Sequence, residues 1–349
     1  TYELGTELRF LNSRIGLEVV GYMSRSKDLL VPAKISNATG FDAAQVNAGE
    51  LENKGIEITL SAIPVRTSDF SWDMRYNFST NKNRVIKLNE GLDEIIIGSS
   101  FGYLSSTVTT KLVPDYSYGA MFGRTYKRYY GNKTDDGFTI AKDQPLLIGS
   151  DGFPIIDTKQ RYLGSSLPKW LFNTVQTFTW KQFALSVLLD VREGQYRYNQ
   201  FANFMAAFGT AKFTENRTET IVFDGVLADG SPNTKPVYLG QGTGPDGHNY
   251  GNGYYRNVYR GSSENFIENA SWVRLRSLAI SYNIPKEILS RTKTFTAASV
   301  SFTGNNLWLK TDFTGFDPES SSEPAGSNAS DAFSGFTYPG IRSFMVSVN

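Results

Sequence analysis

Residues 69–79 constrain the fold of this chain more than any other stretch of its sequence. Large apolar residues alternate there with single polar residues. The apolar positions are Phe70, Trp72, Met74, Tyr76 and Phe78. Because successive side chains of a β-strand point to opposite faces, the segment predicts a strand with one apolar and one polar face. A length of roughly 9–11 residues, with aromatic residues near both ends of the apolar face, is typical of a strand that crosses a bilayer.

The same alternation recurs along the chain and predicts about nine strands. They are expected at residues 2–10, 15–24, 56–62, 70–78, 171–180, 183–192, 271–284, 296–309 and 343–348. A one-residue change of phase at Arg276 and Ser277 predicts a β-bulge. Residues 199–208 are expected to form a short helix, and part of 116–130 a further strand.

The connections between these strands are strongly asymmetric. Short turns are expected near Asn12, Arg66, Lys181 and Lys286, and they alternate with long, polar segments at 25–52, 82–169, 193–270 and 310–340. Short turns on one side and long loops on the other are typical of outer-membrane β-barrels. An odd number of strands, with the first and last strands ending on opposite sides, predicts a part of a larger barrel.

The composition excludes several other classes of protein. The formal net charge of +1 gives no reason to expect a nucleic-acid partner. No run of apolar residues approaches the roughly 18 needed for a membrane helix, and a hydrophobic content of 40% suits strands that are half polar. The absence of cysteine removes disulfides and thiol chemistry. No signal peptide is visible, which for an exported protein predicts that the sequence begins partway along.

Charged residues on the polar sides of the strands are candidate lumen-facing residues. They are Glu7, Arg9, Asp73, Arg75, Asp190 and Arg192. These side chains either contact solute or plug, or simply pair with one another in a water-filled interior. On the opposite faces, lipid contact is expected for Leu8, Phe70, Trp72, Tyr76, Phe78, Leu185, Leu189 and Phe302.

Tyrosine clusters in the long segments are the second group of candidates. They comprise Tyr126, Tyr129, Tyr130, Tyr196, Tyr198, Tyr254 and Tyr255. Tyrosine is amphipathic, so these rings either stack on a substrate or a partner protein, or pack the long loops against one another. No catalytic residue, cofactor or metal site is predicted. The single histidine, His248, lies in a glycine-rich loop, and the Asp-Gly segments fit ordinary turns better than calcium loops.

Several motifs resemble the SusC/RagA-like family of TonB-dependent outer-membrane transporters. The general motifs are N-A-G at 47–49 followed by N-K-G-I-E at 53–57. The more specific ones are W-V-R-L-R-S-L at 272–278 with Y-N-I-P at 282–285, G-N-N-L-W at 304–308, and G-F-D-P-E at 315–319. Y-P at 338–339 before R-S-F at 342–344 is similar to the last strand of that family. The resemblance covers most of the chain.

The resemblance implies an all-β, antiparallel transmembrane barrel of about 22 strands, of which residues 1–349 form the C-terminal part. The plug and the TonB-engaging region are absent from the sequence. The resemblance also implies location in the bacterial outer membrane and import of oligosaccharides or peptides. The expected partners are a SusD-like lipoprotein, the remaining N-terminal part of the transporter, TonB through the absent region, and lipid.

The end of the sequence and an alternative function leave the interpretation open. Members of that family usually end on an aromatic residue, whereas this sequence ends at Asn349, so either a residue is missing or assembly is altered. The alternative function is a soluble all-β binding or adhesin module. The two differ in where the apolar faces go, because a sandwich buries them and a barrel exposes them to lipid.

Overall fold

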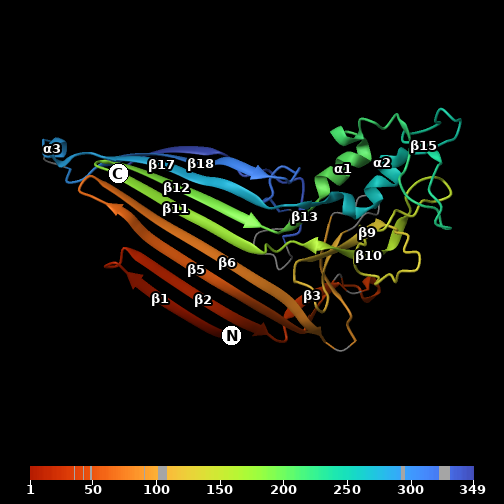
Figure 1. Cartoon of the computed structure of the whole chain (residues 1–349), viewed down its shortest axis with the longest axis horizontal. Coiled ribbons are helices and arrows are strands. Elements are labelled where there is room, and N and C mark those ends of the chain that lie inside the picture. The colour runs from red at the N-terminus through yellow and green to blue at the C-terminus, as the bar shows by residue number, and fades with distance from the viewer. Residues whose placement is uncertain are drawn as a thin grey trace.

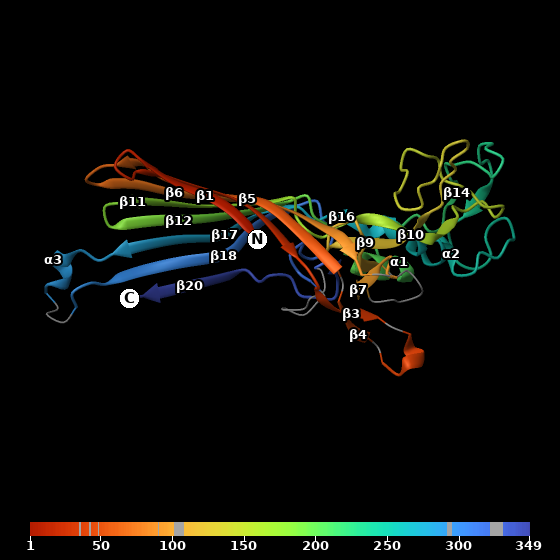
Figure 2. The ribbon, with the colours of Figure 1, turned by 90° about the horizontal axis from the view of Figure 1, so that it is seen from below.

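A nine-stranded antiparallel sheet dominates the structure, with a loop region at one end (Figure 1). The computed structural model describes residues 1–34, 36–41, 43–47, 49–89, 91–100, 108–291, 295–321 and 331–349. The strands of the sheet, in spatial order, are β1 (Tyr2–Phe10), β2 (Ile15–Ser26), β5 (Gly49–Arg66), β6 (Phe70–Leu88), β11 (Trp170–Trp180), β12 (Phe183–Glu193), β17 (Trp272–Asn283), β18 (Ser299–Thr311) and β20 (Ser343–Val348). All nine strands predicted from the alternation are present. Figure 2 shows that the sheet is not flat, since β20 lies well out of the plane of β5 and β6.

Short turns join the strands at the end of the sheet away from the loop region (Figure 1). The β1–β2 turn places Leu11, Asn12 and Ser13 at positive φ angles, and Lys181 does the same between β11 and β12. The predicted short connection near Lys286 runs from Asn283 to Ser299, slightly longer than expected. It contains helix α3 (Lys286–Leu289), with Pro285 at its N-cap.

The long segments are more ordered than the sequence indicated. The predicted loop 25–52 is wrong at both ends, since β2 continues to Ser26 and β5 begins at Gly49. Between them β3 (Leu30–Lys34) pairs with β4 (Ala43–Asn47), and η1 (Asn37–Thr39) lies between these two strands. β6 also extends to Leu88, paired with β5. These extensions lie beyond the apolar part of the sheet. Backbone hydrogen bonds to the neighbouring strand stabilise them, and their sequences lack the period-two alternation that would have predicted them.

A second, four-stranded sheet lies within the predicted loop 82–169. Its strands are β7 (Ile95–Ser99), β8 (Thr109–Leu112), β9 (Ala120–Tyr126) and β10 (Ile156–Ser165). β9 falls within the stretch where a strand was expected. β7, β8 and β9 are short, and β8 and β9 are almost wholly buried, so apolar and polar residues do not alternate along β8 and β9.

Smaller elements complete the loop region. They are β13 (Tyr196–Asn199), α1 (Gln200–Phe208), η2 (Lys212–Thr214), β14 (Thr220–Val222), β15 (Pro236–Tyr238), α2 (Gly253–Asn257), η3 (Tyr259–Gly261), η4 (Ser263–Phe266), β16 (Ile267–Asn269) and β19 (Phe333–Ser334). The predicted helix at 199–208 is confirmed as α1. The Asn199 side chain accepts a hydrogen bond from the Ala202 amide at 3.0 Å, and Gly209 ends the helix at a φ of 62°.

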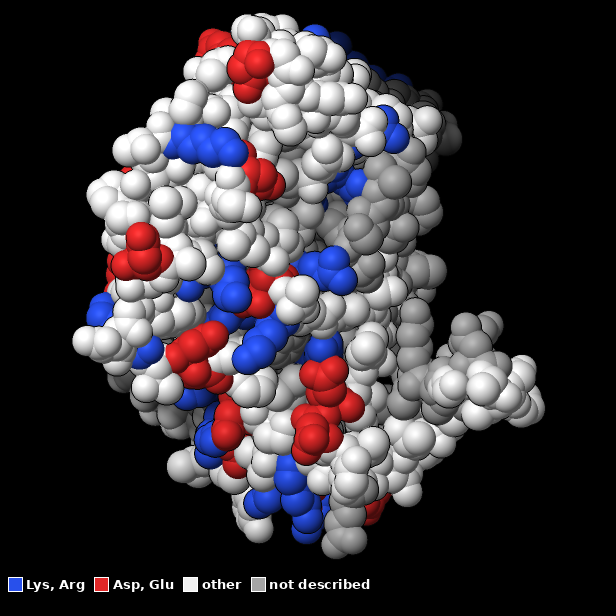
Figure 3. Space-filling model, turned by 90° about the vertical axis from the view of Figure 1, so that its right-hand side faces the viewer, with Lys and Arg blue, Asp and Glu red and all other residues white. Residues whose placement is uncertain are grey.

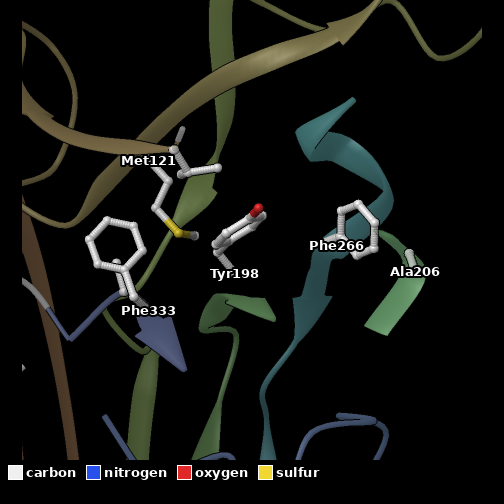
Figure 4. Packing of buried hydrophobic residues seen from close by; sticks show 7 residues of the cluster. Met121, Tyr198, Ala206, Phe266 and Phe333 are labelled. Carbon is white, nitrogen blue, oxygen red and sulfur yellow. The ribbon is translucent and has the colours of Figure 1, made fainter. Parts of the chain in front are cut away.

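The hydrophobic core lies in the loop region and not in the large sheet. The main cluster comprises Val108, Met121, Tyr198, Ala206, Phe266, Ala332 and Phe333 (Figure 4). Of the described residues in the three buried clusters, only Leu51 and Val85 come from the nine-stranded sheet, and both lie on its extensions toward the loops. The described residues include no helix that is long and apolar enough to span a membrane.

Candidate functional site

One face of the nine-stranded sheet is predominantly apolar from β1 to β18, with Thr174 and Gln176 of β11 as polar exceptions. The strand register aligns one row of side chains as Leu8, Leu17, Leu60, Tyr76, Thr174, Leu189, Leu275 and Trp308. Aromatic rings stack between neighbouring strands, with 5.5 Å between the centroids of Trp72 and Phe178. All eight residues expected to contact lipid share this face, and none belongs to a buried cluster among the described residues. This is the arrangement that a membrane-facing wall requires.

The opposite face of the same sheet is polar. Thr59 donates to the Asn77 side chain at 3.1 Å, and Asn77 donates to Asn173 at 2.7 Å, so hydrogen bonds run across three neighbouring strands. The register places all six candidate lumen-facing residues on this face: Glu7, Arg9, Asp73, Arg75, Asp190 and Arg192. Whether the face encloses a lumen stays a prediction.

The pairing of these six residues differs from strand to strand. Glu7 and Arg9 form an ion pair at 2.7 Å with both side chains largely exposed. Asp73 instead accepts from Ser71 at 3.1 Å. Asp190 and Arg192 do not pair with each other, because each reaches a group on another segment.

A compact cluster of arginines and carboxylates occupies the loop end of the polar face. Arg274 bonds Asp317 at 2.6 Å, and both side chains are only 4% exposed. Arg276 bonds Glu319 at 2.6 Å and Asp190 at 3.0 Å. Arg192 lies 3.7 Å from Glu319. We call this group, with Trp272, the Trp272 cluster.

Trp272 provides the platform of the cluster. The guanidinium carbons of Arg192, Arg274 and Arg276 lie 5.4, 5.4 and 4.9 Å from the centre of its ring, which is almost fully buried. Cation–π attraction and the carboxylates together offset the cost of crowding three positive charges. The predicted bulge is confirmed at Arg276, which has no partner residue in the strand register, whereas Leu275 and Ser277 on either side of it do. Arg274 lies directly opposite Asp190 of β12 in the register, and the Arg276 side chain reaches the same carboxylate.

The carboxylates of the cluster tie the segment after β18 onto the sheet. Asp317 also accepts backbone N–H bonds from Glu319 at 2.9 Å and from Gly340 at 3.1 Å. Burial alone would raise the pKa of Asp317, but these backbone donors and Arg274 hold it below its usual value. The pKa of Glu319 is likewise lowered, because Arg276, Arg274 and Arg192 outweigh its burial. Both groups are therefore ionised near neutral pH.

The sequence contained the parts of this cluster without showing that they meet. Residues 272–278 and 315–319 were recognised as motifs, yet Arg274 and Asp317 are separated by 43 positions. The available signal was two arginines on one strand and two acids in a later loop, and many other pairings fit that signal.

The candidate tyrosines fall into two groups. Tyr126, Tyr198 and Tyr254 are almost fully buried, which favours loop packing over external contact for these three rings. The Tyr126 hydroxyl accepts from Asn265 at 2.7 Å and lies 3.4 Å from the Tyr254 hydroxyl. Burial raises the pKa of Tyr126 to about 12. Tyr129, Tyr130 and Tyr255 are half-buried and Tyr196 is 39% exposed, so these four stay candidates for external contact.

A cleft of about 770 Å³ lies where the large sheet meets the loop region. Its walls come from the end of β6, from residues 115–117, from the end of β10 through Lys169, and from Tyr196. Viewed onto the loop end, the molecule carries acidic and basic side chains interspersed on its surface (Figure 3). Within the described part of the chain, no group of three or more His, Asp or Glu side chains could hold a metal ion.

Comparisons with known proteins agree with this architecture. TonB-dependent receptor P3 of Formosa agariphila is 27% identical over 359 residues, which cover 99% of this chain and 33% of the relative. TonB-dependent receptor SusC of Bacteroides thetaiotaomicron is 27% identical over 322 residues, covering 91% of this chain and 29% of the relative. A solved structure of the RagAB peptide transporter matches with a TM-score of 0.65 at 18% identity, covering 99% of this chain and 34% of that one. No family model matches the chain.

The fold is all-β, and along almost its whole length the chain is similar to TonB-dependent receptors, which are receptors and not enzymes. The match to SusC bears out the SusC/RagA-like resemblance that residues 272–278 and 315–319 indicated. The chain spans about a third of the length of the curated relatives it matches.

Proposed function

We propose that this chain forms part of the wall of an outer-membrane importer that depends on TonB. The observation that carries the proposal is the pair of continuous faces on the nine-stranded sheet, apolar on one side and polar on the other. A soluble adhesin would have to bury the apolar face, and the packed clusters instead lie at the loop end. The apolar face then meets lipid and the polar face lines the passage.

The rest of the importer would come from segments outside residues 1–349. β1 and β20 each pair on one side only among the described residues, so both edges of the sheet are available for further strands. Unpaired strand edges are costly in hydrocarbon, which favours closure by other segments. We therefore assign residues 1–349 to the C-terminal part of the barrel and leave the plug and the TonB-engaging region to the remainder.

The test uses neighbouring positions near the middle of β12, because the chain has no cysteine of its own. Ser186 lies on the polar face and Val187 on the apolar face, and both are half-buried. In native membranes we expect Ser186→Cys to react with a water-soluble maleimide and Val187→Cys to stay unreacted until detergent is added. Equal labelling of the two positions before detergent would refute the membrane assignment.

The proposed cargo is an oligosaccharide or a peptide. We propose that a SusD-like lipoprotein binds on the loop side and takes part in its uptake. One similar structure is described as a peptide transporter, which supports a peptide, whereas the oligosaccharide rests on the resemblance to the SusC/RagA-like family. The physical support for a lipoprotein partner on this side is a set of aromatic side chains that are exposed on the loops. Phe316 and Phe336 are 56% and 53% exposed, and their ring centres lie 4.8 and 5.9 Å from that of Phe201 in α1.

Exposed aromatic anchors carry much of the energy of permanent interfaces, which bury 2,000 Å² or more. Replacing both Phe316 and Phe336 by serine should lower recovery of the co-purifying lipoprotein at least tenfold, on the order of a lost hot-spot residue. The matched control is Phe295→Ser, which removes a ring that is 61% exposed beside the opposite, turn end of the sheet. Equal recovery from the double variant and the control would exclude this surface as the docking site.

A further inference from the structure

The cleft between β6 and β10 has walls shaped by two glycines. Gly164 and Gly194 both have positive φ angles, of 142° and 81°. The Tyr196 ring lies directly against Gly164, where a Cβ would come within 3.2 Å of it. The Lys169 stem lies against Gly194, where a Cβ would come within 2.6 Å. Both contacts need glycine, because a side chain at these positions would crowd its neighbour. The two glycines therefore let Tyr196 and Lys169 pack closely into the cleft wall.

The charges that line the cleft do not balance. Lys82, Lys142 and Lys169 line it, are exposed, and form no ion pair within the described part of the chain. Its two lining carboxylates are already neutralised, since Asp115 pairs with Arg84 and Glu264 with Arg128 at 3.0 Å. The cleft therefore carries excess positive charge in a concave, partly shielded space, where the attraction for an anion is strongest.

The remaining lining groups suit a sugar. Tyr116 and Tyr162 form a ring pair with centroids 4.9 Å apart, and Tyr196 adds a third, exposed ring. Hydroxyl and amide groups of Ser117, Ser165, Asn81 and Asn83 lie on the same walls. Tyrosine rings offer apolar faces together with a hydroxyl, and the cleft volume falls within the roughly 300–1,000 Å³ of small-ligand sites.

We propose that this cleft binds an acid-bearing oligosaccharide, with Lys142 and Lys169 holding its anionic groups and the tyrosines contacting its rings. The inference rests on the proposed function only in treating the cleft as part of the path of the imported solute. It narrows the cargo to an anionic glycan.

The test measures binding to the complete protein purified in detergent, by calorimetry at low salt. The probes are tetragalacturonate, a sulfated galactan tetrasaccharide, the neutral galactotetraose and a tetra-aspartate peptide. We expect an acidic tetrasaccharide to bind and the neutral one to bind at least tenfold more weakly. The two acidic glycans distinguish a carboxylate from a sulfate as the preferred group.

The double variant Lys142→Gln/Lys169→Gln should bind the acidic glycan roughly tenfold more weakly, since exposed charge pairs contribute up to about fivefold each. It should leave the weak neutral binding unchanged. The matched control is Lys212→Gln, an exposed lysine of η2 that does not line the cleft.

Equal binding of acidic and neutral glycans, equal loss in the control variant, preference for tetra-aspartate, or no glycan binding would each overturn the proposal. Binding in detergent does not depend on membrane insertion or transport. Its failure is therefore separate from failure of the labelling test on Ser186 and Val187.

Discussion

Asp317→Asn probes the most buried ion pair of the Trp272 cluster. The substitution keeps the size of the side chain but leaves Arg274 without its partner at 2.6 Å, in a place where both groups are 4% exposed. Removing one partner of a buried pair costs about 3–5 kcal/mol. Arg274 keeps Glu319 at 3.7 Å, so we expect the lower end, about 3 kcal/mol. That corresponds to more than a hundredfold increase in local opening of the segment after β18.

The assay is amide hydrogen exchange, read on the peptides that contain Glu319 and Gly340. Both residues donate backbone N–H bonds to Asp317, so their exchange reports directly on the tie between the loop and the sheet. We expect exchange of these amides to accelerate while that of β11 and β12 stays unchanged. The control is Glu7→Gln, which breaks an Arg–carboxylate pair of similar length, 2.7 Å, that is largely exposed. If Asp317→Asn accelerates exchange near its site no more than Glu7→Gln does near its own, the cluster is not the tie that the geometry indicates.

Three further predictions follow from the same structure. The pKa values of Asp317 and Glu319 are depressed, so the stability that these carboxylates contribute is present above the ordinary carboxylate range and is lost as pH falls through the depressed values. The measurement is Trp272 fluorescence emission, isolated by comparison with the Trp272→Phe variant. It should stay constant from pH 7 to 5 and change only below about pH 4. Met121→Ala, in the fully buried loop cluster, should cost about 2–5 kcal/mol and lower the melting temperature of the loop region, whereas Met345→Ala on the exposed strand β20 should change it little. Residues 1–349 expressed alone should aggregate, because both edges of the sheet are unpaired in the described part of the chain. Recovery of a folded, monomeric closed barrel from them would contradict this.

The strand faces could be predicted because period-two alternation is a local property. Phe70, Trp72 and Phe78 share a face in any strand that contains them, and the chain between them needs no partner to establish it. The phase change at Arg276 was readable for the same reason. A sheet with lipid on one side and water on the other needs apolar residues on the first face and polar residues on the second. The alternation of apolar and polar residues is therefore regular wherever a strand contacts both.

The loop region shows what local patterns leave open. Tyr196 and Tyr198 are two positions apart in β13, yet the first is 39% exposed and the second 1%. Tyr198 is covered by Phe266, Phe333 and Met121, which come from other parts of the chain (Figure 4), whereas Tyr196 lies at the open end of the strand over Gly164. No periodicity distinguishes the two rings, because burial there depends on which distant segments arrive to cover them.

The sequence by itself therefore determined the nine strands, their two faces and the side on which the long connections lie, since each follows from the alternation of neighbouring residues and the spacing of turns. Only the tertiary structure decided which charges meet on Trp272, which tyrosines are buried and where the lysine-lined cleft opens. Those features join residues such as Arg274 and Asp317 across 43 positions of chain. Contacts of that kind are set by how the loops pack over the end of the sheet, and the free energy of that packing is shared among many residues that carry no local signal.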